Sequence, residues 1–159
     1  EGGAVLTNDP GALELLRQIR NAGRSPNGWV IGINGRMPEM AAALGLSQLA
    51  RFDDGIRRRE RIAAHYGATG LHGIPRKVWH LYQILMPKRD TVALRLREAG
   101  IGTAVHYPVI PGYEGDLRGA RHFAAETLSI PMYPSLTDAE VEYVASTVKR
   151  VVEETRGGP

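Results

Sequence analysis

The stretch GINGRMPEMAAALGLSQL, residues 32–49, joins a glycine-rich loop to a helical pattern. Pro38 suits the first turn of a helix, because its missing N–H would have no partner there. Apolar residues continue at helical spacing and predict one long connecting helix over residues 37–66. A helix of this length is unusual within one small domain. We therefore expect it to join the end of one domain, residues 1–36, to a second domain, residues 67–159.

Shorter elements are predicted on both sides of this helix. Residues 2–7 have the pattern of a strand, and a helix follows that Asp9 can cap and Gly23 can end. Leu13, Leu16 and Ile19 lie about a turn apart and predict an apolar inner face on this helix. Residues 24–37 predict an apolar loop that either lines a site or interface or packs on its own core. The remaining elements are predicted in the order strand 77–87, helix 89–100, strand 101–111, helix 115–129, an extended link over 130–135 and a last helix from residue 136. Thr137 and Glu140 predict a capping box at the start of this last helix, and its buried stripe is expected to be Val141, Val144, Val148 and Val151. The fold class expected is α/β, with a small α+β domain at the C-terminal end.

The composition excludes several classes of site. The chain has 159 residues and no cysteine, so disulfides, thiolate nucleophiles and cysteine-bound metals are excluded. No apolar run approaches the roughly 18 residues of a membrane span, and we expect a cytoplasmic protein with no membrane partner. The histidines have no metal-ligand spacing; they are His65, His72, His80, His106 and His122.

The densest basic run is RRRER, residues 57–61. It is open to interpretation as a nucleic-acid patch or as a solvated helix face. Asp53 and Asp54 lie four residues before Arg57 and Arg58, a spacing that favours ion pairs along a helix. No aromatic residues interleave the run to stack on bases. We therefore expect ion pairs here and no nucleic-acid partner.

Sequence motifs for self-contained catalytic sites are absent. There is no G-x-S-x-G, H-E-x-x-H, P-loop or G-x-G-x-x-G pattern. The residues alone indicate an α/β protein. Its candidate site residues lie near Asn34, in a glycine-rich segment, and near His106, at a predicted strand end. An asparagine beside glycines is also a common turn residue.

Five segments, taken together, are much more specific. In chain order they are EGGAVLTND, LLRQIRNAG, GINGRMPEMAAALGLSQL, AGIGTAVHYP and LSIPMYPSLTDAEV. This series resembles the DegT/DnrJ/EryC1/StrS family of pyridoxal-phosphate-dependent sugar aminotransferases over nearly the whole chain. The resemblance implies a fold-type-I transferase. Residues 1–36 would be the end of the large cofactor-binding domain, 37–66 the connecting helix and 67–159 the small C-terminal domain.

The resemblance also implies an activity. A complete member would use pyridoxal 5'-phosphate to move an amino group from an amino acid, with glutamate the expected donor, to a nucleotide-linked keto-sugar. Such products serve antibiotic or surface-polysaccharide biosynthesis. Two alternatives stay open within the same family: a sugar dehydratase, and a non-catalytic partner subunit or remnant.

No catalytic residue is expected within this chain. The resemblance implies that the lysine that holds the cofactor lies a few residues before the first glycines, and so ahead of Glu1. That lysine forms the Schiff base and moves the substrate proton. The lysines present, Lys77, Lys88 and Lys149, do not stand at its position. We therefore expect this chain to be a fragment of a longer enzyme.

The resemblance assigns roles to five residues. Asn34 would bind the cofactor phosphate of a partner subunit, within a homodimer that shares its active sites. Arg36 would hold the phosphate or the interface, or else form a structural ion pair. His106 and Tyr107 would line the nucleotide-sugar pocket, with His80 a weaker candidate for substrate binding.

The chain also departs from the family pattern. The family often has an aromatic residue where Gly35 stands and a glutamine where Ala41 stands. The connector over residues 67–77 and the segment after Pro108 look short. These differences lead us to expect a substrate pocket that differs from that of other members.

Overall fold

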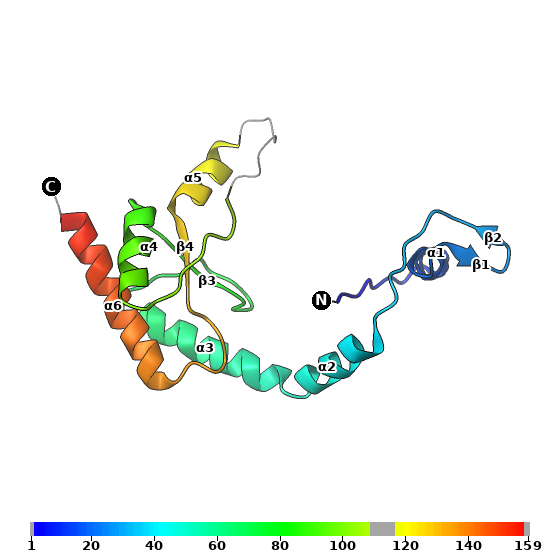
Figure 1. The fold of residues 1–159 in the computed structure, drawn as a ribbon, viewed down its shortest axis with the longest axis horizontal. Helices are drawn as coiled ribbons and strands as arrows, with labels where there is room; N and C mark the ends of the chain where they lie inside the picture. The colour runs from blue at the N-terminus through cyan, green and yellow to red at the C-terminus, as the bar shows by residue number, and fades with distance from the viewer. Residues whose placement is uncertain (1, 109–116, 158–159) are drawn as a thin grey trace. The chain divides into compact units, whose positions relative to one another are not determined.

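The computed structural model describes residues 2–108 and 117–157. The chain forms two compact units, Glu1–Phe52 and Asp53–Pro159. The elements of the first unit are α1 (Pro10–Arg20), β1 (Arg24–Ser25), β2 (Gly28–Trp29) and α2 (Glu39–Leu49). Those of the second are α3 (Phe52–Ala68, beginning at the boundary), β3 (Tyr82–Leu85), α4 (Arg89–Glu98), α5 (Arg118–Glu126), β4 (Thr127–Ile130) and α6 (Asp138–Gly157), all shown in Figure 1.

Helix α1 begins and ends as its sequence predicts. The Asp9 carboxylate accepts hydrogen bonds from the backbone N–H groups of Gly11 and Ala12, at 2.8 and 3.2 Å. These bonds satisfy two of the donors that a helix N-terminus leaves free. The chain reverses at Gly23, whose φ of 77° favours glycine. A Cβ on Gly32 would lie 2.2 Å from the Gly23 nitrogen, so both glycines are needed where the backbone returns against itself.

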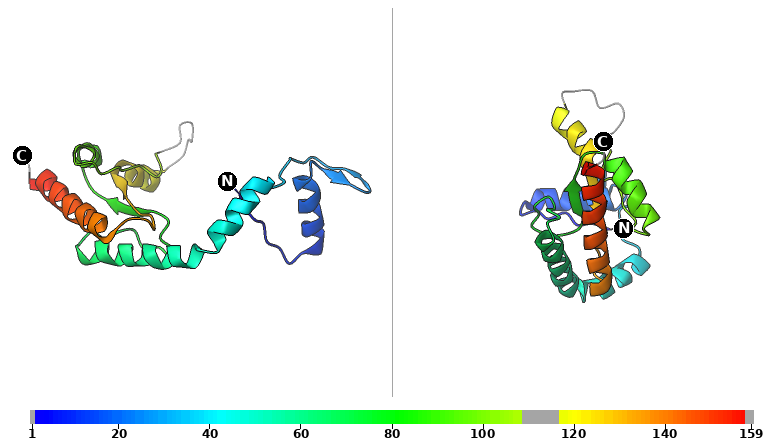
Figure 2. Two further views of the ribbon diagram at one scale, coloured as in Figure 1. Left: turned by 60° about the horizontal axis from the view of Figure 1, so that its bottom comes forward. Right: turned by 90° about the vertical axis from the view of Figure 1, so that its left-hand side faces the viewer.

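The first unit differs from prediction in two respects. Residues 2–7 form no strand within the described chain, so that prediction was wrong; no neighbouring strand is present there to complete a ladder. Residues 24–37 are not simply a loop, because β1 and β2 pair antiparallel as a short hairpin next to α1 (Figure 2).

The connecting helix is also not continuous, and the single helix predicted over residues 37–66 was wrong. Helix α2 ends at Leu49 and α3 begins at Phe52. The Arg51 N–H bonds to the Gln48 carbonyl at 3.0 Å, a tighter spacing than that of an α-helix. No residue of α2 is buried within the described chain. Helical periodicity alone could not reveal this interruption.

The second unit is built around the antiparallel pair β3–β4. Its register places Tyr82 opposite Ile130 and Ile84 opposite Leu128. Because side chains alternate along a strand, these four residues share one face, and all are buried. Helices α3, α4 and α6 lie beside this pair (Figure 1) and supply the rest of the core: Ile62, Ala63, Tyr66, Val92, Leu96, Val141, Val144, Ala145, Val148 and Val151. The valine stripe expected on the last helix is thus confirmed.

The strands of this unit are shorter than predicted. The strand expected over residues 77–87 is β3 alone, and among the described residues 101–108 of the strand expected over 101–111 only Ala104 forms a bridge, to Ser129. Strand β4 lies where the sequence predicted the end of a helix and a link. Consequently neither His80 nor His106 lies within a strand, contrary to prediction.

A tyrosine holds the connector before β3. The Tyr82 hydroxyl donates to the Leu71 carbonyl at 2.5 Å and accepts from the Gly73 N–H at 3.1 Å. A Cβ on Gly73 would lie 2.7 Å from the Tyr82 ring, so the chain passes directly over that ring. Burial raises the pKa of Tyr82, which keeps the hydroxyl protonated as a donor. The connector is therefore fixed at Leu71–Gly73.

The arginine run serves the fold. Arg57 pairs with Asp54 at 2.6 Å, whereas Arg58 pairs with Asp138 at the start of α6, also at 2.6 Å. The predicted i,i+4 pairs are therefore replaced by one i,i+3 pair and one tertiary contact. Arg59 donates to the carbonyls of Met132 and His80, at 2.6 and 3.1 Å. Buried carbonyls need such partners, and the run supplies them.

The capping box predicted at the start of α6 is confirmed and generates a pH prediction. The Glu140 carboxylate accepts from the Thr137 N–H at 2.7 Å and from its hydroxyl at 2.8 Å. These bonds, the backbone one first, hold the pKa of Glu140 below its ordinary value of 4.5. The resulting stabilisation is present above pH 4.5 and is lost as the pH falls through the lowered folded-state pKa.

We expect Glu140→Gln to lower the melting temperature at neutral pH and to reduce the fall of the melting temperature on acidification.

The measurement is thermal unfolding from neutral pH to well below 4.5, with Glu153→Gln on the same helix as the control. An unchanged acid dependence in Glu140→Gln would contradict the assignment.

Candidate functional site

Asn34 lies on a segment that is fixed to the end of α1. Residues Asn21 and Asn34 form an isolated antiparallel bridge. The N–H of Ile33 bonds to the Ile19 carbonyl and that of Gly35 to the Arg20 carbonyl, both at 2.8 Å. The Asn34 side chain is exposed and makes no hydrogen bond within residues 2–108 and 117–157. Its backbone is thus held while its amide is free for a ligand.

Arg36 lies in the same segment and is partly engaged. One of its guanidinium nitrogens donates to the Asn21 side-chain oxygen at 2.7 Å. That contact is with a neutral amide, and within residues 2–108 and 117–157 Arg36 forms no ion pair of the kind considered from the sequence. A guanidinium has five N–H donors, and most of those on Arg36 remain for another acceptor.

The inner face of α1 is open. A hollow of about 570 Å³ within the first unit is lined by this face, through Leu13, Leu16 and Ile19, and by Val5 and Ile33. No residue of α1 is buried. The helix therefore has the apolar face predicted for it, and nothing in this unit fills the space that the face borders.

His106 and Tyr107 lie together in the second unit. Their rings meet edge to face, with centroids 5.1 Å apart. His106 is partly buried, and its Nδ1 lies 2.8 Å from the Ser129 hydroxyl. Tyr107 is 69 % exposed. The pair thus presents one anchored imidazole and one accessible phenol at the surface.

Two buried polar residues, Gln83 and Ser129, hydrogen-bond to His106, and a third, Thr127, lies beside the Gln83 amide; sequence reasoning missed all three. Gln83, Thr127 and Ser129 are at most 5 % exposed. The register pairs Gln83 with Ser129, so these side chains share the face of β3–β4 opposite the core. The sequence signal that could have identified these residues is the alternation of apolar and polar residues in Tyr82–Leu85 and Thr127–Ile130. In both segments a polar residue follows or precedes each core residue.

Within the described residues, no contact joins His80 to His106. Its carbonyl accepts from Arg59, and its side chain is exposed. The structure uses the backbone of His80 to anchor the chain before β3. Its role in substrate binding remains a prediction.

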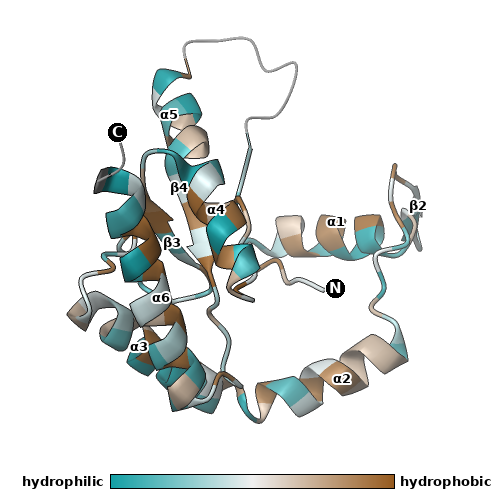
Figure 3. Cartoon of the chain, turned by 60° about the vertical axis from the view of Figure 1, so that its left-hand side comes forward, coloured by the Kyte–Doolittle hydropathy of each residue, from teal (hydrophilic) through white to brown (hydrophobic). Residues whose placement is uncertain are grey.

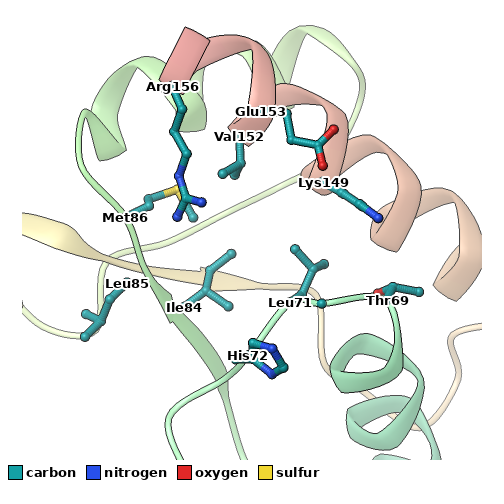
Figure 4. Close-up of a pocket in the computed structure, with 11 residues that line it drawn as sticks. Thr69, Leu71, His72, Ile84, Leu85, Met86, Lys149, Val152, Glu153 and Arg156 are labelled. Atoms are coloured by element: carbon teal, nitrogen blue, oxygen red, sulfur yellow. The ribbon is translucent and has the colours of Figure 1, made fainter.

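A second hollow, of about 320 Å³, lies between α6 and β3. Figure 4 shows Lys149, Val152, Glu153 and Arg156 from α6 on one side and Ile84, Leu85 and Met86 on the other. Lys149 therefore borders this hollow of the second unit, and the first unit contains no lysine at all.

Metal and membrane features are not found in the described chain. Within residues 2–108 and 117–157, no three histidine or acidic side chains gather as a metal site would require. No helix in that part of the chain is both long and apolar enough to cross a bilayer. The short segment noted after Pro108 falls on residues 109–116, outside the described residues.

The chain is similar to one family of known proteins over most of its length. Residues 1–149 match the model of the DegT/DnrJ/EryC1/StrS aminotransferase family. The chain belongs to this family. It is 36 % identical to dTDP-3-amino-3,4,6-trideoxy-alpha-D-glucose transaminase of Streptomyces venezuelae, across 96 % of the chain and 46 % of that protein. It is 31 % identical to the UDP-N-acetyl-3-dehydro-alpha-D-glucosamine 3-aminotransferase of Acidithiobacillus ferrooxidans, across 96 % and 46 %.

Solved structures of the family share the fold. The crystal structure of S. venezuelae DesV superposes with a TM-score of 0.82 at 34 % identity, across 93 % of the chain and 46 % of DesV. The predicted fold class, that of fold-type-I transferases, is confirmed. The chain spans about half the length of the curated relatives it matches.

Proposed function

We propose that this chain is the C-terminal half of a pyridoxal-phosphate-dependent enzyme that transfers an amino group to a nucleotide-linked keto-sugar. The observation that carries the proposal is that this half aligns with transaminases named for dTDP- and UDP-linked sugars. What these relatives share is amino transfer to a sugar bearing a nucleotide. Glutamate is the proposed donor, and antibiotic or polysaccharide assembly the proposed destination.

The residues around Asn34 fit a cofactor phosphate. The Asn34 amide is exposed and unpartnered within the described chain, on a backbone that the hydrogen bonds of Ile33 and Gly35 fix to the end of α1. A neutral amide donor on a fixed backbone, two residues from Arg36, suits a phosphate, because the backbone that carries it loses little freedom on binding. When bound, the cofactor would supply the electron sink for amino transfer.

The lysine that holds the cofactor is proposed to belong to the other half of the protein. Lys77, Lys88 and Lys149 all lie in the second unit. The segment that presents Asn34 lies in the first. The role left to this chain is to bind the phosphate and to present His106 and Tyr107 to the nucleotide sugar, whose hydroxyl and diphosphate oxygens accept hydrogen bonds.

The first prediction of the proposed function concerns the reaction itself. The full-length protein, supplied with pyridoxal phosphate, should release 2-oxoglutarate from glutamate and aminate a nucleotide-linked keto-sugar. Mass spectrometry of the sugar product is the measurement, and residues 1–159 expressed alone are the control, expected to be inactive. Release of water from the sugar without gain of nitrogen would instead show a dehydratase.

The second prediction concerns the phosphate. Asn34→Ala in the full-length protein should weaken retention of pyridoxal phosphate by about ten- to a hundredfold, the effect of one lost hydrogen bond to a charged group. The measurement is cofactor affinity from absorbance during equilibrium dialysis. Asn27→Ala, in the nearby hairpin turn, is the matched control. Equal affinities for the two variants would remove Asn34 from the site.

A homodimer is proposed because the first unit exposes large apolar side chains. Trp29 is 75 % and Ile31 97 % exposed in the hairpin region, and Met40 is 87 % exposed on α2. Figure 3 shows hydrophobic residues along much of α2. Exposed apolar groups on this scale mark surfaces that another chain segment covers. A second copy would also place Asn34 against the phosphate in its partner, as the resemblance implies.

The third prediction is that the full-length protein is a dimer and that Ile31→Arg weakens it. A buried charge at the interface has no partner and opposes association. Light scattering across a concentration series is the measurement. Leu94→Arg, on an exposed site of α4, is the control and should leave the dimer intact. A monomeric unmodified protein at micromolar concentration would contradict the proposal.

A further inference from the structure

The face of β3–β4 that carries Gln83 and Ser129 is polar although both side chains are buried. A buried hydroxyl or amide costs free energy unless it is hydrogen-bonded. Gln83 is 2 % exposed and Ser129 5 % exposed, on the sheet face opposite the apolar core. A sheet that needed only a packed second face would carry apolar residues at these two positions.

The hydrogen bonds from this face converge on one residue. The Gln83 amide nitrogen donates to the His106 carbonyl at 2.6 Å. The Ser129 hydroxyl lies 2.8 Å from Nδ1 of the His106 ring. One residue thus fixes the backbone at His106 and the other fixes its side chain.

Both anchors are themselves held. The Gln83 side-chain oxygen accepts from Arg76, which orients the amide so that its N–H groups face away from the guanidinium. The backbone of Ser129 is paired with Gln83 in the sheet and exchanges two hydrogen bonds with Ala104, at 2.8 and 3.2 Å. His106 follows Ala104 by two residues, so its segment is tied to β4 through Ala104 and to β3 through the Gln83 amide.

We propose that Gln83 and Ser129 are positioning residues that prepare His106 and Tyr107 to bind the nucleotide sugar. This inference rests on the proposed function. With Nδ1 engaged by Ser129, Nε2 is the ring nitrogen left for substrate. When the Ser129 hydroxyl donates to Nδ1, Nε2 carries the proton and can donate to a hydroxyl or diphosphate oxygen. Preorganising that donor reduces the entropy lost when the sugar binds.

The experiment separates the two half-reactions of the full-length protein. Glutamate carries neither the sugar hydroxyls nor the diphosphate that His106 and Tyr107 would contact, so release of 2-oxoglutarate tests the proposed function independently. Ser129→Ala removes the hydroxyl, and Gln83→Glu keeps an acceptor for Arg76 but loses the N–H donor to His106. Each should raise KM for the nucleotide sugar by about three- to tenfold, the effect of one hydrogen bond, and leave 2-oxoglutarate release unchanged.

A second readout does not depend on activity. In protein labelled with ¹⁵N-histidine, Ser129→Ala should shift the Nδ1 resonance of His106, because its hydrogen-bond partner is gone. Thr155→Val is the matched control. It also removes a buried hydroxyl, one that donates to the Val151 carbonyl of its own helix at 2.7 Å, and should alter neither the resonance nor KM.

Two outcomes would overturn the inference while leaving the proposed function in place. One is an unchanged KM for the sugar in both Ser129→Ala and Gln83→Glu; the other is a rise in KM that Thr155→Val reproduces. Failure of the unmodified protein to release 2-oxoglutarate would instead overturn the proposed function, and with it the substrate role of His106.

Discussion

The second unit depends on a two-stranded sheet whose faces have opposite chemical character. The register of β3 with β4 turns Tyr82, Ile84, Leu128 and Ile130 toward the helices. Burying each such side chain contributes about 1.5–3 kcal/mol. The same register turns Gln83 and Ser129 to the other side, where their hydrogen bonds hold His106. Stability and the candidate substrate surface therefore follow from one pairing, and a shift by one residue would exchange the two faces.

Local signals in the sequence predicted the features that short-range physics determines. The Asp9 cap, the Thr137 and Glu140 capping box and the valine stripe of α6 each depend on residues within one or two helical turns. The family, and through it the fold, followed from five motifs in order. These features needed no knowledge of which distant segments meet.

Tertiary contacts explain where prediction failed. Strand β4 has four residues and exists because β3 and Ala104 lie on either side of it. Its sequence also continues a helical pattern, so only the partners decide the structure. The break between α2 and α3, at Ala50 and Arg51, likewise has no signal in the helical pattern of the sequence. For the site, the sequence named His106 and Tyr107 but missed Gln83 and Ser129, whose importance lies in contacts across 23 residues.

The hydroxyl of Tyr82 has a consequence for how this family varies in length. The alignments with relatives extend over 166 to 195 residues, although the chain has 159, so relatives contain insertions. The hydroxyl spans Leu71 to Gly73, and the Ile74 N–H bonds to the Gln83 carbonyl. Additional residues between Leu71 and Ile74 would break these bonds and expose buried groups. Insertions in this connector are therefore compatible with the fold only before Leu71 or between Ile74 and β3. At those places a longer loop would leave the hydrogen bonds of the Tyr82 hydroxyl intact.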